Sequence, residues 1–160
     1  MSLHIEKIAK SKFENIDFSN LTFGDIFTDH MYECDFENGE WQTPIIKPYQ
    51  ALTIDPSAKV FHYGQAVFEG MKAYKDDNDE IWLFRPDQNQ KRLNISAERL
   101  DMPAFPKDLF FEGLTTLLKM DSDWIQKGQE NALYIRPFII ATEHCISAAT
   151  SNKYKFMIIC

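Results

Sequence analysis

The feature that most constrains the fold is a long helical stretch placed between short extended runs. Two early runs flank Asn38-Gly39, a strong hairpin signal because both residues readily adopt the positive φ that a two-residue turn needs. Extended runs are predicted at 28–36, 40–47, 67–75, 81–85, 131–142 and 153–160. The third and fourth of these runs are predicted to form a second hairpin that turns at 76–79.

The stretch after the second hairpin has the spacing of two amphipathic helices. Pro86 suits the first helical position, where no backbone N–H is needed. Leu93, Ala97 and Leu100 recur at i, i+4 and i+7, which predicts a helix over about 86–101 with one buried face. Pro103 and Pro106 end it. A second helix is predicted over about 107–120, with a buried stripe of Phe110, Leu114, Leu117 and Leu118.

This order of elements predicts an α+β domain, with an antiparallel sheet and the helices packed on one of its faces. The 160 residues suffice for one domain. Residues 1–20 are mixed and polar and are predicted to form an N-terminal arm, and residues 21–160 to form the domain. Because the run at 153–160 stays apolar to its last residue, we expect a C-terminal domain to follow it in a longer protein.

Composition excludes several classes of function. The net charge is -7 and the largest basic cluster is Gln90-Lys91-Arg92, so we expect no nucleic-acid partner. The sequence contains no run of ~20 apolar residues and no apolar signal core, so we expect no membrane span and a cytoplasmic protein. Three cysteines without a metal-binding spacing favour a reducing compartment and no metal site.

Five segments carry residues suited to chemistry, and they occur in a characteristic order. They are Phe23–Met31, Phe61–Tyr74, Leu83–Pro86 with Arg92 and Leu93, Ala97–Leu100 and Leu133–Pro137. In sequence and spacing they resemble the branched-chain amino-acid aminotransferases, which are fold-type IV enzymes dependent on pyridoxal 5'-phosphate (PLP). The resemblance extends from about Phe23 to Cys160 and covers the family's N-terminal domain.

The resemblance implies an enzyme that moves an amino group between leucine, isoleucine or valine and 2-oxoglutarate (EC 2.6.1.42). Arg92 matches the arginine that contacts the PLP phosphate, and the planar fork of an arginine can bind two phosphate oxygens. From the residues alone, a surface salt bridge would be the commoner role for Arg92. Tyr63 matches the tyrosine whose hydroxyl points to the substrate carboxylate.

The remaining candidate residues match the walls of the family's substrate pocket. They are Phe23, Phe68, Tyr134, Arg136, Ile146 and Ala148. The three aromatic residues would form an apolar pocket, although core packing would equally explain them. Arg136, two residues after Tyr134 on one strand face, would meet the side-chain carboxylate of glutamate, or else be buried with its tip hydrogen-bonded. Ile146 and Ala148 would reach the neighbouring subunit of a homodimer, although a solvent loop would also explain them.

The resemblance places the lysine that binds PLP covalently in the C-terminal domain, beyond Cys160. Lys72 is then structural, and the isolated chain should be inactive and should not hold PLP covalently. Two alternatives remain: a non-catalytic, self-assembling module with an exposed apolar face, or another fold-type IV enzyme, such as D-amino-acid transaminase or aminodeoxychorismate lyase. The segments Phe68–Lys72 and Asp29–Met31 favour the branched-chain group.

Overall fold

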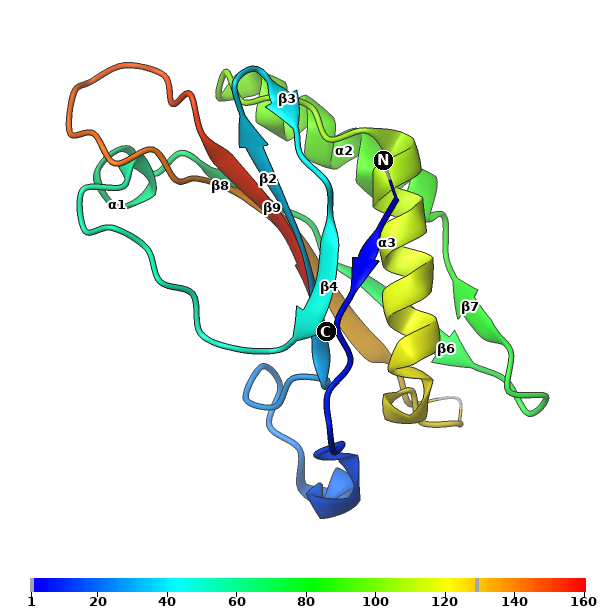
Figure 1. Cartoon of the computed structure of the whole chain (residues 1–160). Helices are drawn as coiled ribbons and strands as arrows, with labels where there is room; N and C mark the ends of the chain where they lie inside the picture. Colours follow the sequence, from blue (N-terminus) through cyan, green and yellow to red (C-terminus); the bar gives the residue numbers. More distant parts are fainter. Residues whose placement is uncertain (1, 129) are drawn as a thin grey trace.

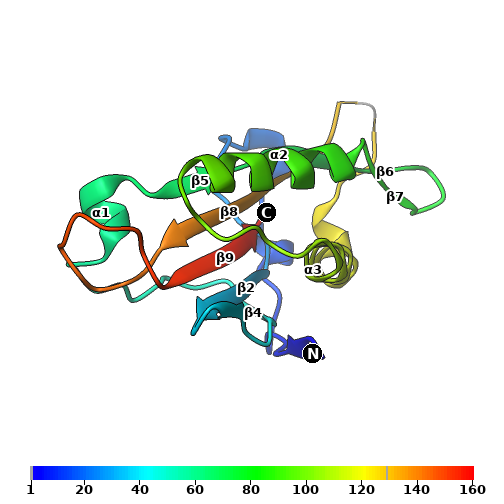
Figure 2. The ribbon, with the colours of Figure 1, turned by 90° about the horizontal axis from the view of Figure 1, so that it is seen from above.

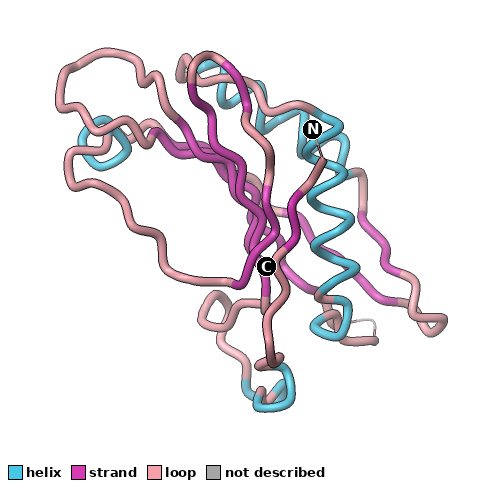
Figure 3. Tube along the Cα trace, in the orientation of Figure 1, coloured by secondary structure: helices cyan, strands magenta, loops and turns pink. Residues whose placement is uncertain are grey.

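The computed structural model describes residues 2–128 and 130–160 and has a curved sheet with two long helices (Figure 1). The strands are β1 His4–Ile5, β2 His30–Glu37, β3 Glu40–Trp41, β4 Ile45–Pro48, β5 Ala66–Phe68, β6 Met71–Lys75, β7 Ile81–Leu83, β8 Leu133–Ala141 and β9 Tyr154–Ile159. The helices are α1 Lys59–Tyr63, α2 Pro86–Arg99 and α3 Lys107–Met120, with short 3-10 turns at Phe13–Asn15, Phe18–Asn20 and Ser122–Trp124. Figure 3 distinguishes the central strands from the helices around them.

The strands form one sheet in the order β1-β4-β2-β9-β8-β6-β7, with β3 beside β2 and β5 beside β8. The α+β class is confirmed, but the sheet is mixed, because β1 pairs with β4 in parallel. The other strand pairs in the described part of the chain are antiparallel. The parallel pair comes from the predicted arm, where the His4 N–H donates to the Pro44 carbonyl and the Glu6 N–H to the Ile46 carbonyl of β4.

The helices α2 and α3 cover one face of the sheet, as predicted (Figures 1 and 2). The stripe predicted for α3 is fully buried, and so are Leu93 and Ala97 of α2. Leu100, predicted to lie on the same buried face, is 42% exposed. It is the residue after the last turn, where φ and ψ of −103° and 14° no longer follow the helix. The predicted face therefore ends one residue too late.

The Asn38-Gly39 turn forms as predicted, with positive φ at both residues between the paired Glu37 and Glu40. The predicted strand 40–47 is interrupted, however. Its first part pairs Phe36 with Trp41, whereas its second part pairs Glu33 with Ile45, so one extra residue lies on that side of the ladder. Such a bulge bends the edge of a sheet.

The predicted strand 67–75 is also divided, into β5 and β6, although both parts pair with β8 in one continuous register. The interruption at Glu69 and Gly70 lies opposite Pro137. The Glu69 N–H still donates to the Pro137 carbonyl at 2.9 Å, but a proline has no N–H to return. The predicted hairpin forms only between β6 and β7, where Ala73 pairs with Leu83 and Lys75 with Ile81, and Pro137 explains the gap that separates β5 from β6.

Gly113 should be indispensable for the packing of α3 on β2. A Cβ there would lie 2.3 Å from Cε2 of Tyr32, a fully buried ring whose hydroxyl bonds to the Leu109 carbonyl. Glycine to alanine normally stabilises a helix interior by about 0.5–1 kcal/mol. Here we expect Gly113→Ala to lower the free energy of unfolding by about 1–3 kcal/mol, because the ring has no space to move. Urea unfolding measures this, and Thr115→Ala, at an exposed position of α3, is the control that should change little. Equal stability of the two variants would contradict the prediction.

Candidate functional site

The side chains of β8 alternate between the two faces of the sheet, and Tyr134 and Arg136 point away from the helices. We call these two residues, with Phe23 and Phe68, the arginine cluster. The Arg136 guanidinium lies 4.3 Å from the ring centre of Phe68, and its Nη2 donates to the Tyr134 hydroxyl at 2.9 Å. The Phe23 ring meets Tyr134 edge to face at 5.0 Å. The structure thus brings four of the predicted pocket residues together.

Gly70 allows the arginine cluster to form. A Cβ at Gly70 would lie 2.2 Å from the Tyr134 hydroxyl oxygen, so any larger residue would push the tyrosine away. The Nε atom of Arg136 is buried and has no hydrogen-bond partner within the described residues. An unpaired buried donor is costly, and a ligand acceptor or an ordered water would remove that cost.

Beside the arginine cluster lies a cavity of about 450 Å³. The segment 21–28 forms much of its wall, together with Trp124, Tyr134, Arg136 and Cys160. The wall is anchored at several points. The Thr28 N–H donates to the Cys160 carbonyl at 2.9 Å, and the Trp124 indole donates to Asp29 at 3.0 Å. A largely apolar cavity with a single guanidinium suits a small ligand that is apolar and carries an anionic group.

Arg92 lies elsewhere, on α2, and forms an ion pair with Glu69. Its Nε and Nη2 both donate to the Glu69 carboxylate, the latter at 2.8 Å. The Asn89 amide donates to the same carboxylate at 2.9 Å. Burial of Glu69 disfavours its charged form, but the hydrogen bonds from Arg92 and Asn89 outweigh this and hold the pKa of Glu69 below its ordinary value.

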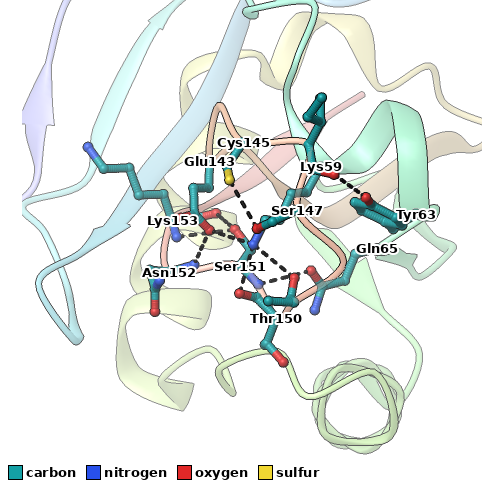
Figure 4. Close-up of polar contacts among 12 residues, drawn as sticks. Lys59, Tyr63, Gln65, Glu143, Cys145, Ser147, Thr150, Ser151, Asn152 and Lys153 are labelled. Carbon is teal, nitrogen blue, oxygen red and sulfur yellow. Dashed lines mark hydrogen bonds and ion pairs between the residues drawn. The ribbon is translucent and has the colours of Figure 1, made fainter.

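The remaining predicted residues lie at the far end of β8. The hydroxyl of Tyr63, at the end of α1, donates to the Ile146 carbonyl in the loop between β8 and β9 (Figure 4). Ile146 and Ala148 are exposed on that loop. In Figures 1 and 2, α1 and this loop lie together at one end of the molecule. At about 3.3 Å per residue, β8 puts roughly 16 Å between Arg136 and Ala141, and Tyr63 binds the loop that lies beyond Ala141, so it is not part of the arginine cluster.

Sequence reasoning did not single out the residues that hold the candidates in place. Glu69 and Asn89 orient Arg92, and Gly70 admits Tyr134. Lys59 and Gln65 bond to the loop after β8. Glu69, Gly70 and Gln65 lie inside the segment Phe61–Tyr74 that carries the resemblance. The sequence therefore marked their region, but it did not show which residues they contact. Lys59 lies just outside that segment and carried no such signal.

Two further observations concern the described residues only. None of the helices there is long and apolar enough to cross a membrane. In the same part of the chain, no three His, Cys, Asp or Glu side chains are grouped as metal ligands.

Replacing Glu69 with glutamine should destabilise the fold in a pH-dependent way. Because the pKa of Glu69 is lowered in the folded state, its contribution is complete above the ordinary glutamate pKa of about 4.3 and is lost as the pH falls through the lowered value. At pH 7 we expect Glu69→Gln to cost about 1.5–3 kcal/mol, the usual value of hydrogen bonds to a charged group. Urea unfolding at pH 7 and at decreasing pH below about 4.3 measures the difference. Glu112→Gln, at an exposed site on α3, is the control, and identical profiles for the two variants would refute the prediction.

Comparisons of sequence and of structure both find branched-chain aminotransferases similar to this chain. No protein-family model matches the chain. The chain is 52% identical over 147 residues to branched-chain-amino-acid transaminase 1 of Bacillus subtilis, covering 91% of this chain and 41% of that protein. It is 46% identical over 154 residues to branched-chain-amino-acid aminotransferase 2 of the same organism, covering 96% and 42%.

The fold agrees with these relatives. The branched-chain amino acid aminotransferase of Thermobaculum terrenum, solved in its PLP form, superposes with a TM-score of 0.58 over 82% of this chain and 39% of that one. At 19% identity, this likeness shows the shared fold alone. The chain spans about two fifths of the length of the curated relatives it matches. By sequence it belongs to the branched-chain aminotransferase family, and it has the α+β fold of that family's N-terminal domain.

Proposed function

We propose that this chain forms one wall of the active site of a branched-chain amino-acid aminotransferase. The enzyme would move an amino group between leucine, isoleucine or valine and 2-oxoglutarate, with PLP as its cofactor. The observation that carries the proposal is the arginine cluster beside its apolar cavity. The names of the relatives support the reaction, since both Bacillus subtilis proteins are branched-chain transaminases.

The arginine cluster suits an enzyme that must accept two different side chains in turn. Phe23, Phe68 and Tyr134 offer apolar surface, and each buried CH₂ of a branched substrate gains about 0.8 kcal/mol. Glutamate would place its side-chain carboxylate against Arg136, whose Nε is buried without a partner in the described residues. Tyr134 holds the guanidinium through its hydroxyl, so the arginine is positioned before any ligand arrives.

Arg92 fits the role of phosphate ligand. Glu69 holds the Nε edge of the guanidinium, and within the described residues Nη1 has no protein acceptor. The cavity along this side of α2 is lined by three cationic side chains, Arg85, Lys91 and Arg92. A planar arginine fixed at one edge presents its other edge to an anion, the geometry that phosphate binding uses. PLP, when bound, supplies an electron sink for the substrate α-carbon.

The covalent attachment of PLP is proposed to lie outside this chain. Lys72 is exposed on β6, opposite Tyr134 in the ladder, and no carboxylate pairs with it among the described residues. We assign it a structural role and propose that a lysine of a C-terminal domain carries the cofactor. The isolated 160-residue chain would then bind the substrate side chain incompletely and would not transaminate.

The group at the other end of β8 is proposed to serve a second site. Tyr63, Ile146 and Ala148 are not among the residues that line the cavity beside the arginine cluster. In a homodimer, this end of one subunit would close the pocket of its partner, with Tyr63 orienting the substrate carboxylate. We propose a homodimer on this basis, and a cytoplasmic location from the composition of the sequence.

Activity assays test the proposal directly. We expect an enzyme that joins this chain to its natural C-terminal domain to transaminate leucine with 2-oxoglutarate, and the 160-residue chain with added PLP to show no turnover. Turnover by the short chain would make Lys72→Ala the next variant, since Lys72 would then be the candidate for the covalent bond. Preference of the longer enzyme for D-alanine or aminodeoxychorismate would replace the branched-chain assignment with another fold-type IV activity.

Arg136 should discriminate between the two amino donors. In the longer enzyme we expect Arg136→Met to lower kcat/KM for glutamate by about 100-fold, because the side-chain carboxylate loses a charged partner. The value for leucine should fall by less than about 10-fold, because only packing against the pocket changes. Arg99→Met, at the exposed end of α2, is the control. Equal losses for glutamate and leucine would remove Arg136 from glutamate recognition.

A further inference from the structure

Lys59, the first residue of α1, is a buried cation with no part in the pocket described above. Its side chain is only 2% exposed, although an ammonium group is strongly hydrated in water. Moving such a group out of water is strongly unfavourable unless the protein supplies equivalent partners. The sequence around it, Ser57-Ala58-Lys59, gives no sign of this burial.

The partners of Lys59 all belong to the loop between β8 and β9. Its Nζ donates to the Ala149 carbonyl at 2.8 Å and to the Thr150 carbonyl at 3.0 Å, and it pairs with Glu143 Oε2 at 3.0 Å (Figure 4). A lysine ammonium has three N–H donors, so these three acceptors satisfy it completely.

These contacts join the two ends of the loop. Glu143 lies just after β8, and Ala149 and Thr150 lie shortly before β9. The Glu143 carboxylate also accepts the Asn152 N–H at 2.8 Å, and its carbonyl accepts the Lys59 N–H at 3.1 Å. Lys59 and Glu143 therefore close the loop at its base. Holding the two ends together reduces the conformational freedom of the loop between them.

The same short helix also holds the tip of the loop. Tyr63 follows Lys59 by four residues, which places both side chains on one face of α1. Its hydroxyl donates to the Ile146 carbonyl, between the two segments that Lys59 binds. Gln65 Oε1 accepts the Ser151 N–H at 3.4 Å, and Asp101 accepts the Thr150 hydroxyl at 2.8 Å.

We propose that Lys59 is a positioning residue that fixes the 143–150 loop so that Ile146 and Ala148 are presented to the substrate pocket. The proposal rests on the proposed function for the role of that loop. Lys59 itself touches no substrate and acts through the backbone that it binds. Its removal should loosen the loop and weaken substrate binding, while leaving the arginine cluster intact.

Hydrogen exchange on this chain tests the anchoring without reference to activity. In Lys59→Met, which keeps the length but removes the charge, we expect the amides of 143–152 to exchange about tenfold faster, with α3 unchanged. Lys155→Met is the matched control, because Lys155 is also a mostly buried lysine paired with carboxylates, Glu33 and Asp35, away from the loop. Unchanged loop exchange in Lys59→Met, or an equal increase in Lys155→Met, would overturn the proposal.

A second variant covers the case in which Lys59→Met does not fold. Glu143 is partly exposed, so Glu143→Ala should fold. It removes one of three Nζ partners and the acceptor of Asn152, and we expect exchange in the loop to rise by about threefold. Unchanged exchange in Glu143→Ala would count against the anchor.

Kinetic measurements on the longer enzyme test whether the loop held by Lys59 contributes to substrate binding. We expect Lys59→Met to raise KM for leucine by about 5- to 10-fold with kcat within about twofold, the pattern of lost uniform binding. A fall in kcat alone would overturn the presentation of the loop to the substrate. If the unsubstituted longer enzyme does not transaminate leucine, the proposed function is wrong. The hydrogen-exchange result would still show whether Lys59 anchors the loop.

Discussion

The alternation of side chains along β8 separates the core of this protein from its candidate site. Ile135, Ile139 and Ala141 point to the helices and are buried, whereas Tyr134 and Arg136 point to the opposite face. A shift of register by one residue would exchange these two sets, placing the guanidinium in the core and the isoleucines in the cavity. Pairing on both sides of β8 excludes this shift, because β9 binds one edge while β5 and β6 bind the other.

Pro137 affects both parts of this arrangement. It lies in the middle of β8 and interrupts the ladder toward β5 and β6 at Glu69 and Gly70. At this gap Glu69 turns to α2 and binds Arg92, and Gly70 leaves room for the Tyr134 hydroxyl. The missing N–H of Pro137 therefore coincides with the place where two adjacent residues serve different groups. Phe68 contacts Arg136, whereas Glu69 binds Arg92.

Local patterns predicted most of the fold, and long-range contacts account for what they missed. Asn38-Gly39 and the stripe of α3 depend on neighbours in sequence, so periodicity and turn chemistry were sufficient. The break in 67–75 depends on Pro137, and the bulge after Trp41 depends on pairing with β2, so neither pattern was visible locally. The resemblance placed both Tyr63 and Arg136 among the pocket residues. Only the structure shows that Arg136 lies within β8 whereas Tyr63 contacts the loop after β8. Lys59 reaches acceptors about ninety positions away, which no spacing rule could have suggested.

The buried charges explain why these positions are well defined. Glu69 and Lys59 are each at least nine-tenths buried, and each is satisfied by more than one partner from a different element. A buried ion pair adds little net stability, but an arrangement that leaves one member unpaired is heavily penalised. Each charge therefore selects one placement of its neighbours: Glu69 selects the rotamer of Arg92, and Lys59 selects the path of the 143–150 loop. Glu69 acts opposite Pro137 in the middle of β8, and Lys59 acts on the loop that follows β8, so each charge positions its own group of candidate residues.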